Sequence, residues 1–103
     1  MPQYMVTMDI HRADPLLPID QLAGVIREAV LPSVERLMEL KAQRKVVTGG
    51  YPVGQRAIVF IIETDSEEEL YEILEGLPLS EVAKARVTEL KSFEELRRGD
   101  DLG

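Results

Sequence analysis

The sequence contains no cysteine, no tryptophan and a single histidine, His11. Without cysteine the chain can form no disulfide, and it has no thiol nucleophile and no thiolate ligand for a metal. One histidine is also too few for most histidine-rich zinc sites. We therefore expect no metal centre, and the missing cysteines fit a protein of a reducing compartment.

Positively charged residues are also scarce. The chain has 12 Lys and Arg residues against 19 Asp and Glu residues, a formal net charge of −7, and its positive residues form no stripe. Such a chain repels phosphate backbones, so we expect no nucleic-acid partner. No stretch approaches the roughly 20 apolar residues needed to cross a bilayer, and the first residues carry no basic segment followed by an apolar run. We expect a soluble, cytoplasmic protein with no membrane partner.

The length of the chain sets its domain organisation. Its 103 residues suffice for one domain and not for two. We predict a single domain over residues 1–98 and a disordered tail over residues 99–103, because the sequence is polar from Gly99 onward. A core of this size buries only a modest share of the surface of the unfolded chain, so a partner surface would add stability.

The first half of the sequence predicts a strand and then a helix. Apolar residues alternate with polar ones over residues 3–10, which is the period of a strand with one buried face. Between Leu22 and Met38, apolar residues recur at steps of three and four, which indicates a helix with one apolar face, and Asp20 is its candidate N-cap. Pro32 lies inside this pattern without changing its phase, so we predict either one kinked helix or two abutting helices.

A hairpin follows. Residues 44–48 and 56–63 are its predicted strands, and a cluster of turn-forming residues between them is its predicted turn: Gly49, Gly50, Pro52 and Gly54.

The last third of the sequence predicts a helix, a strand and a short terminal helix. Ser66 and Glu69 form a capping box that begins the first of these helices, and the Gly and Pro at residues 76–78 end it. Residues 82–90 predict a final, partly exposed strand, and an N-cap at Ser92 opens the terminal helix.

Strands and helices in this order predict the ferredoxin-like βαββαβ fold, an α+β fold with a four-stranded antiparallel sheet and both helices on one face. The third strand is apolar on both of its sides over residues 57–62, so the face without helices would leave an apolar patch in water. A second copy packed sheet to sheet would cover that patch. We therefore predict a homodimer that closes a two-subunit barrel around a two-fold axis.

Several short motifs carry a resemblance to a known family. They are Gly49-Gly50 before the third strand, the apolar run at residues 58–62, the helix start Ser66-Glu67-Glu68-Glu69-Leu70, Leu77-Pro78-Leu79 and the closing Leu90-Lys91-Ser92-Phe93. Through these motifs, residues 37–95 resemble the muconolactone isomerase-like family of the dimeric α+β barrel superfamily. The chain departs from that family because it lacks tryptophan and has Lys45-Val46-Val47 where true isomerases carry aromatic or histidine residues. The scaffold carries over, but no catalytic residue does.

The resemblance implies a cofactor-free isomerase that moves a proton within an unsaturated lactone during the breakdown of aromatic compounds, often as a ring of dimers. It therefore implies no cofactor and a small-molecule ligand with a carboxylate or lactone group. A proton shift of this kind needs a base, an acid and a cation for the substrate carboxylate.

Five residues are candidates for these roles. His11, two residues after Asp9 at the end of the first strand, can act as a general base oriented by that carboxylate. Tyr51 can cap a pocket with its hydroxyl, and these three residues form the predicted catalytic set. Arg56 can bind a substrate carboxylate, and Glu63, at the end of the third strand, is the second predicted substrate-binding residue. His11, Arg56 and Glu63 also have an ordinary structural explanation as strand-end residues in solvent, and Tyr51 has one as a turn residue that packs over its own hairpin.

Three functions follow from these features. The isomerase prediction requires that at least two of His11, Tyr51, Arg56 and Asp9 converge in one pocket. The first alternative is a non-catalytic small-ligand-binding or assembly module, which is favoured by the few groups that titrate near neutral pH and predicts a closed, apolar interior. The second alternative is a cofactor-free monooxygenase acting on polycyclic aromatics, for which two phenylalanines and three tyrosines supply little aromatic wall.

Overall fold

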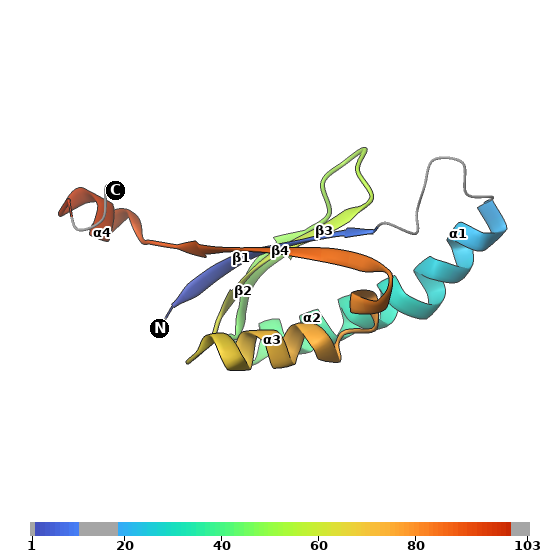
Figure 1. Ribbon diagram of the computed structural model, residues 1–103, viewed down its shortest axis with the longest axis horizontal. Coiled ribbons are helices and arrows are strands. Elements are labelled where there is room, and N and C mark those ends of the chain that lie inside the picture. Colours follow the sequence, from blue (N-terminus) through green and yellow to red (C-terminus); the bar gives the residue numbers. More distant parts are fainter. Residues whose placement is uncertain (1, 11–18, 100–103) are drawn as a thin grey trace.

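A computed structural model describes residues 2–10 and 19–99 of the chain (Figure 1). A π-helical segment, Ile26–Val30, joins the first two helices, and a 3-10 turn, Pro78–Glu81, precedes the last strand. The helices and strands, in chain order, are β1 (Gln3–Ile10), α1 (Ile19–Val25), α2 (Leu31–Ala42), β2 (Val46–Gly50), β3 (Ala57–Glu63), α3 (Glu67–Gly76), β4 (Ala83–Leu90) and α4 (Phe93–Arg97). No helix within the described ranges has the length and apolar character needed to span a membrane.

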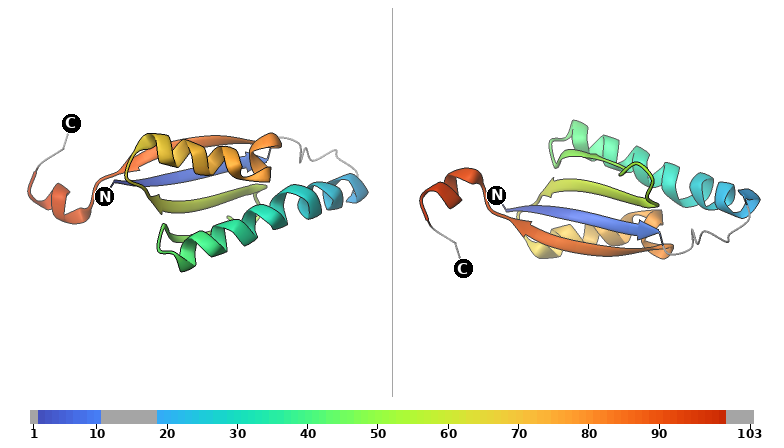
Figure 2. Two further views of the ribbon diagram at one scale, coloured as in Figure 1. Left: turned by 90° about the horizontal axis from the view of Figure 1, so that it is seen from below. Right: turned by 90° about the horizontal axis from the view of Figure 1, so that it is seen from above.

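The four strands form one antiparallel sheet in the order β2-β3-β1-β4. Helices α2 and α3 lie side by side against one face of this sheet (Figures 1 and 2). The arrangement confirms the predicted ferredoxin-like α+β fold. Because β1 and β3 are the central strands, their side chains on the helix-facing side are the most deeply covered.

The core lies between the sheet and these two helices. Residues directly opposite each other in an antiparallel pair point to the same face, so the register of β1 and β3 fixes which side chains enter the core. The helix-facing pairs are Tyr4 with Ile62, Val6 with Phe60 and Met8 with Ile58, and all six residues are buried. Burial raises the pKa of the Tyr4 hydroxyl, with smaller contributions from the carboxylates of Glu67 and Glu89 and from Tyr71, so this phenol stays neutral in the core.

The first helical region is continuous from residue 19 to residue 42, and it accommodates Pro32 through the π-helical segment that precedes it. The N–H of Leu31 donates to the carbonyl of Ile26, five residues back. A proline ring would clash with the carbonyl four residues back in a regular α-helix, and the wider π turn relieves that clash. The predicted helical region is therefore confirmed, with α1 and α2 abutting end to end through the π-helical segment. The region begins at Ile19, so Asp20 lies in its first turn and is not its N-cap.

The end of α2 differs from the sequence prediction. The N–H of Lys45 donates to the carbonyl of Leu40 at 2.9 Å, and the N–H of Arg44 donates to the carbonyl of Lys41 at 3.0 Å. Together with the left-handed φ of 65° at Arg44, these bonds form a Schellman-type helix end. Residues 44 and 45 therefore cap a helix, and β2 begins only at Val46, two residues later than predicted.

Gly49 and Gly50, two of the three glycines of the predicted turn, lie inside β2 instead. A Cβ at Gly49 would come within 2.8 Å of the Phe60 Cβ and of the Val59 carbonyl oxygen, so the close approach of β2 to β3 requires glycine at this position. The actual turn covers residues 51–56, where Gly54 adopts a φ of 84°.

The two predicted serine caps are confirmed. The Ser66 Oγ accepts a hydrogen bond from the N–H of Glu69 at 3.2 Å, and the Ser92 Oγ accepts one from the N–H of Glu95 at 3.1 Å. Helix α3 ends at Gly76 as predicted, and β4 is mostly exposed, as its mixed composition indicated.

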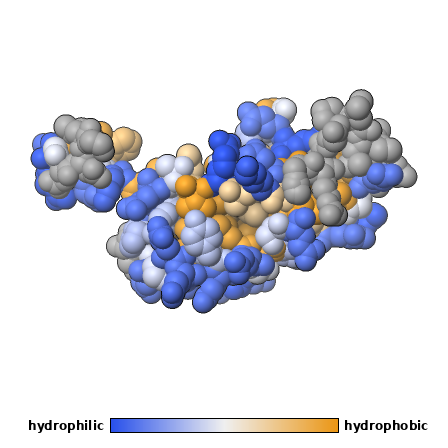
Figure 3. Space-filling model, viewed as in Figure 1, coloured by the Kyte–Doolittle hydropathy of each residue, from blue (hydrophilic) through white to orange (hydrophobic). Residues whose placement is uncertain are grey.

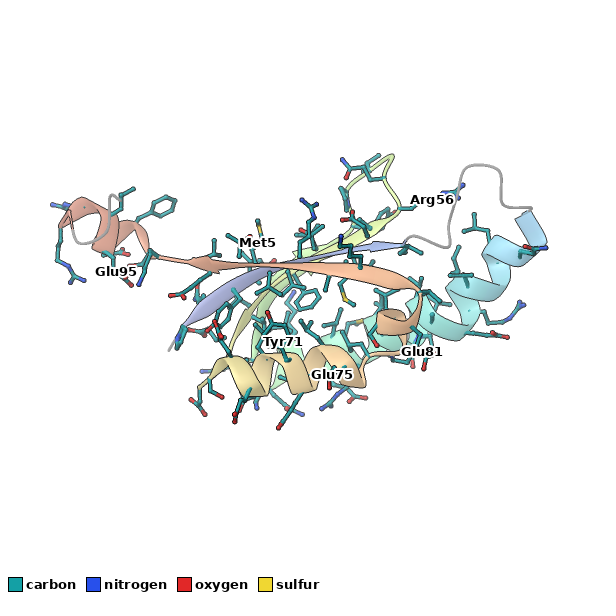
Figure 4. The ribbon with its side chains drawn as sticks, in the orientation of Figure 1. Met5, Arg56, Tyr71, Glu75, Glu81 and Glu95 are labelled. Carbon is teal, nitrogen blue, oxygen red and sulfur yellow. The ribbon has the colours of Figure 1, made fainter. Side chains whose placement is uncertain are left out.

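Outside the 51–56 turn at one end, the sheet face opposite the helices carries no other described element (Figure 2). Met5, Val59 and Ile61 lie on this face, and Met5 remains 37% exposed (Figure 4). A further apolar surface follows the edge of the sheet between β4 and α3, beside the half-exposed Tyr71 (Figures 3 and 4). Helix α4 stands away from the sheet and leaves Phe93 87% exposed. The described part of the chain thus leaves apolar surfaces that none of its own elements covers.

Candidate functional site

A cavity of about 200 Å³ lies between α2 and the β2–β3 hairpin. Its walls are largely apolar, with Val34, Leu37 and Met38 coming from α2 and Val46, Ile58 and Phe60 from the sheet. Apolar clefts with a few polar groups are the usual form of small-molecule sites. This cavity is therefore the candidate site.

Two features of β2 open space for this cavity. The pairing of β2 with β3 shifts register between Val46 and Thr48, which is a β-bulge, and such a bulge bends the strand that carries it. Gly49 and Gly50 then follow, and neither contributes a side chain to the space beside α2. The strand can approach β3 closely at Gly49 while the cavity stays open.

The cavity lining has two polar side chains, Lys41 and Tyr51. Lys41 lies in the last turn of α2 and is exposed. Tyr51 directly follows β2 and is 71% exposed, so it lies at the mouth of the cavity. Among the described lining residues, Lys41 carries the only formal charge. The cavity can therefore combine apolar contact with one cation and one hydroxyl.

Of the predicted site residues that the structure describes, Tyr51 is the one that lines the cavity. Asp9 lies opposite Ala57 and Lys84, on the sheet face that points away from the helices. There its Oδ2 accepts a hydrogen bond from the Arg86 Nε at 3.2 Å, which is a diagonal cross-strand ion pair. Asp9 is therefore not among the residues that line the cavity with Tyr51.

Arg56 and Glu63 also lie outside the cavity lining. Arg56 precedes β3, and its carbonyl accepts a hydrogen bond from the N–H of Ile10 at 2.9 Å, which ties the ends of β1 and β3 together. Glu63, at the far end of β3, lines a polar surface groove with residues near the start of α4. The described parts of the chain contain no cluster of three or more carboxylate or imidazole groups able to hold a metal ion. His11 follows Ile10 directly and lies outside the described residues.

Sequence reasoning missed Lys41, although a signal was present. Val34, Leu37, Met38 and Lys41 occupy positions i, i+3, i+4 and i+7 of α2, which is one helical face. A lysine that continues an apolar face has its aliphatic stem beside that face and its ammonium at the rim. That position marks Lys41 as a polar group at the edge of an apolar surface.

Comparisons with known proteins identify the family. A search of curated proteins finds no significant match to the chain. The family model described as muconolactone delta-isomerase matches residues 3–95, which include β1 and every lining residue of the cavity. This match extends the region of resemblance seen in the sequence to nearly the whole chain. The chain belongs to the muconolactone delta-isomerase family.

Proposed function

We propose that the chain is a cofactor-free, muconolactone isomerase-like enzyme that binds a small carboxylated or lactone compound in the cavity and moves a proton within it. The family match over residues 3–95 is the observation that carries the proposal. The size of the cavity supports it, because an apolar cavity of about 150 Å³ holds one benzene molecule. A cavity of about 200 Å³ suits a compound with a single ring.

Tyr51 and His11 are the proposed proton-handling residues. The Tyr51 hydroxyl lies at the cavity mouth and can donate a hydrogen bond to an oxygen of the substrate that gains negative charge. The described lining contains no carboxylate and no imidazole, so the base must come from elsewhere. His11 is proposed for this role because imidazole accepts a proton readily at physiological pH, and because it follows β1 where Ile10 is bonded to the start of the hairpin strand.

Proton transfer can be tested with muconolactone in heavy water. The base takes a proton from the substrate, exchanges it for a deuteron from the solvent and returns the deuteron to the substrate. NMR should therefore show the isomerised product with deuterium incorporated. We expect His11→Gln to reduce turnover by about 100-fold or more and to leave ligand binding unchanged, since general acid–base catalysis contributes at least that factor. Tyr51→Phe should reduce turnover with a smaller change in binding.

A non-catalytic ligand-binding module is the second candidate function, and the absence of a carboxylate or imidazole from the described cavity lining favours it. Under this alternative, the wild-type chain binds muconolactone but produces neither isomerised product nor deuterium incorporation. A chain that neither binds nor converts the compound would contradict both functions. The size of the cavity does not favour a polycyclic substrate, so the monooxygenase alternative gains no support.

We also propose that the chain acts as a homodimer. The sheet face opposite the helices leaves Met5 partly exposed beside Val59 and Ile61, and helix α4 extends from the body with Phe93 in solvent. Apolar surface of this kind is typical of regions that pack against another chain. A second copy is the partner that a two-fold axis supplies without a further component.

A further inference from the structure

A group of polar side chains lies at the edge of the sheet, away from the cavity, where β1 and β4 lie beside α3. Tyr4 and Glu89 are directly opposite each other in the pairing of β1 with β4, so both point to the helix-facing side of the sheet. Glu67 and Tyr71 are four residues apart on α3 and therefore share one face of that helix. Burial raises the pKa of the Tyr4 hydroxyl, and the two carboxylates and Tyr71 raise it further, so all three lie near that hydroxyl. None of the four residues lines the cavity.

The Tyr4 hydroxyl has no hydrogen-bond partner in this group. Only 4% of the residue is exposed. In the described parts of the chain no hydrogen bond involves the Tyr4 side chain, whereas every fully enclosed side-chain oxygen or nitrogen there has a partner. The hydroxyl oxygen must therefore reach the surface at the end of an otherwise buried ring. It offers an unused hydrogen-bond acceptor beside two carboxylates.

The surroundings of this hydroxyl are negatively charged and accessible. Glu67 is exposed and has no ion-pair partner among the residues that the structure describes. The Glu89 Oε2 lies 3.6 Å from the Lys91 Nζ, but such exposed pairs contribute little, and a carboxylate accepts more than one donor. Glu89 also lines the polar surface groove, to which Glu63 and Glu95 add two further carboxylates. A cation can therefore approach Tyr4 through an acidic surface.

We propose that this edge of the molecule binds a primary alkylammonium ion, at a site that is separate from the cavity and goes beyond the proposed function. The ammonium would donate a hydrogen bond to the Tyr4 hydroxyl and pair with the carboxylates of Glu67 and Glu89. Tyr71, which is 49% exposed, would offer its ring face to the cation. The alkyl chain would lie on the apolar surface between β4 and α3 (Figure 3). The ligand thus needs a positive charge, an N–H donor and a short apolar chain.

The net charge of the chain has to be separated from this specific site. A molecule of net charge −7 attracts any cation weakly over its whole surface. Such attraction would not depend on a hydroxyl group or on the position of one carboxylate. The test therefore compares ligands of equal charge and variants of equal charge.

The experiment measures binding of butylammonium, butyltrimethylammonium and neutral butanol to the full chain by NMR titration. We expect butylammonium to bind at least about tenfold more tightly than butanol, because butanol forms no charge-assisted hydrogen bond with the carboxylates. Butyltrimethylammonium carries the same charge without an N–H donor, so it should bind more weakly than butylammonium. Tyr4→Phe should weaken butylammonium binding by about fivefold and leave butyltrimethylammonium binding unchanged, because it keeps the ring and removes only the hydroxyl.

Glu67→Gln tests the carboxylates, and Glu35→Gln is its matched control. Glu35 is exposed on α2, and its replacement changes the net charge by the same amount. Glu67→Gln should weaken butylammonium binding by about fivefold and Tyr71→Leu by about threefold, whereas Glu35→Gln should leave it unchanged. Equal affinities for butylammonium and butanol, unchanged butylammonium binding in Tyr4→Phe, or equal losses in the two glutamate variants would overturn the inference.

This inference and the proposed function can fail independently. Glu67 lies outside the cavity, so Glu67→Gln should leave any conversion of muconolactone unchanged while it weakens butylammonium binding. A parallel loss of both in this variant would contradict a separate site.

Discussion

Gly49 illustrates how a single residue shapes the cavity. A Cβ at this position would meet backbone and side-chain atoms of β3 at 2.8 Å, closer than real Cβ contacts. We expect Gly49→Ala to push β2 away from β3, to lower the free energy of unfolding by about 1–3 kcal/mol, and to weaken ligand binding because one wall of the cavity moves. Chemical denaturation followed by circular dichroism measures the change in stability.

The adjacent glycine is a matched control. A Cβ at Gly50 would meet no atom within 4 Å, so Gly50→Ala should change the free energy of unfolding by less than about 0.5 kcal/mol. Similar losses for the two variants would show that the close approach at Gly49 is not the cause. The sequence pattern predicts that both glycines form the turn of the hairpin, whereas in the structure both lie in β2. The contact that requires Gly49 lies on another strand, so no local pattern could reveal it.

Between elements, Ser33 links α2 to the 3-10 turn before β4. Its Oγ accepts a hydrogen bond from the N–H of Leu79 at 2.8 Å, and both residues are fully buried. Ser33→Ala would leave that N–H buried without a partner, so we expect the free energy of unfolding to fall by about 1–3 kcal/mol. The measurement is a denaturant titration of wild type and variant under one set of conditions.

Ser80→Ala provides the comparison for this prediction. The Ser80 Oγ donates to the Glu75 carbonyl at 3.5 Å in an exposed position, so its loss should cost less than about 0.5 kcal/mol. If Ser33→Ala were as mild as Ser80→Ala, water or another group would have to satisfy the Leu79 N–H, and the proposed link between the elements would be wrong.

Local chemistry explains which elements could be predicted. The caps at Ser66 and Ser92 satisfy N–H groups three residues away, so the sequence contains both partners. The hydrogen bond from the Leu79 N–H to the Ser33 Oγ joins residues 46 positions apart, and no sequence pattern near Ser33 indicates it. The π-helical segment before Pro32 could not be predicted either. The apolar residues keep the same helical spacing on both sides of it, so the sequence pattern does not show the change from an α-helix to a π-helix.

For the whole molecule, the order of elements was enough to predict the sheet and the helical layer. The candidate site was less predictable, because a cavity arises from the spacing between elements and not from any one of them. The strand pattern and the turn pattern led to Asp9 and Tyr51 as predicted site residues. The register of β1, however, places Asp9 on the sheet face opposite the helices. One residue of register decides which face a side chain occupies. Lys41 lines the cavity because α2 packs beside the β2–β3 hairpin.

The uncovered sheet face leads to the prediction for the assembly. Met5 is 37% exposed on that face, so a glutamate there can reach water in a single folded chain but would be buried without a partner in a sheet-to-sheet dimer. We expect wild type to sediment at twice the mass of one chain, and Met5→Glu to weaken dimerisation by about 100-fold or more. Analytical ultracentrifugation over a range of concentrations measures both.

Leu31→Glu is the control for that assembly, because Leu31 is 51% exposed on the helical side of the molecule and acquires the same charge. It should remain dimeric while Met5→Glu dissociates. If wild type sediments as a single chain at micromolar concentration, or if both variants dissociate equally, the open sheet face is not the dimer interface. Far-UV circular dichroism of Met5→Glu distinguishes a folded monomer from an unfolded chain, since the dimer prediction requires that the fold of each subunit survives the change.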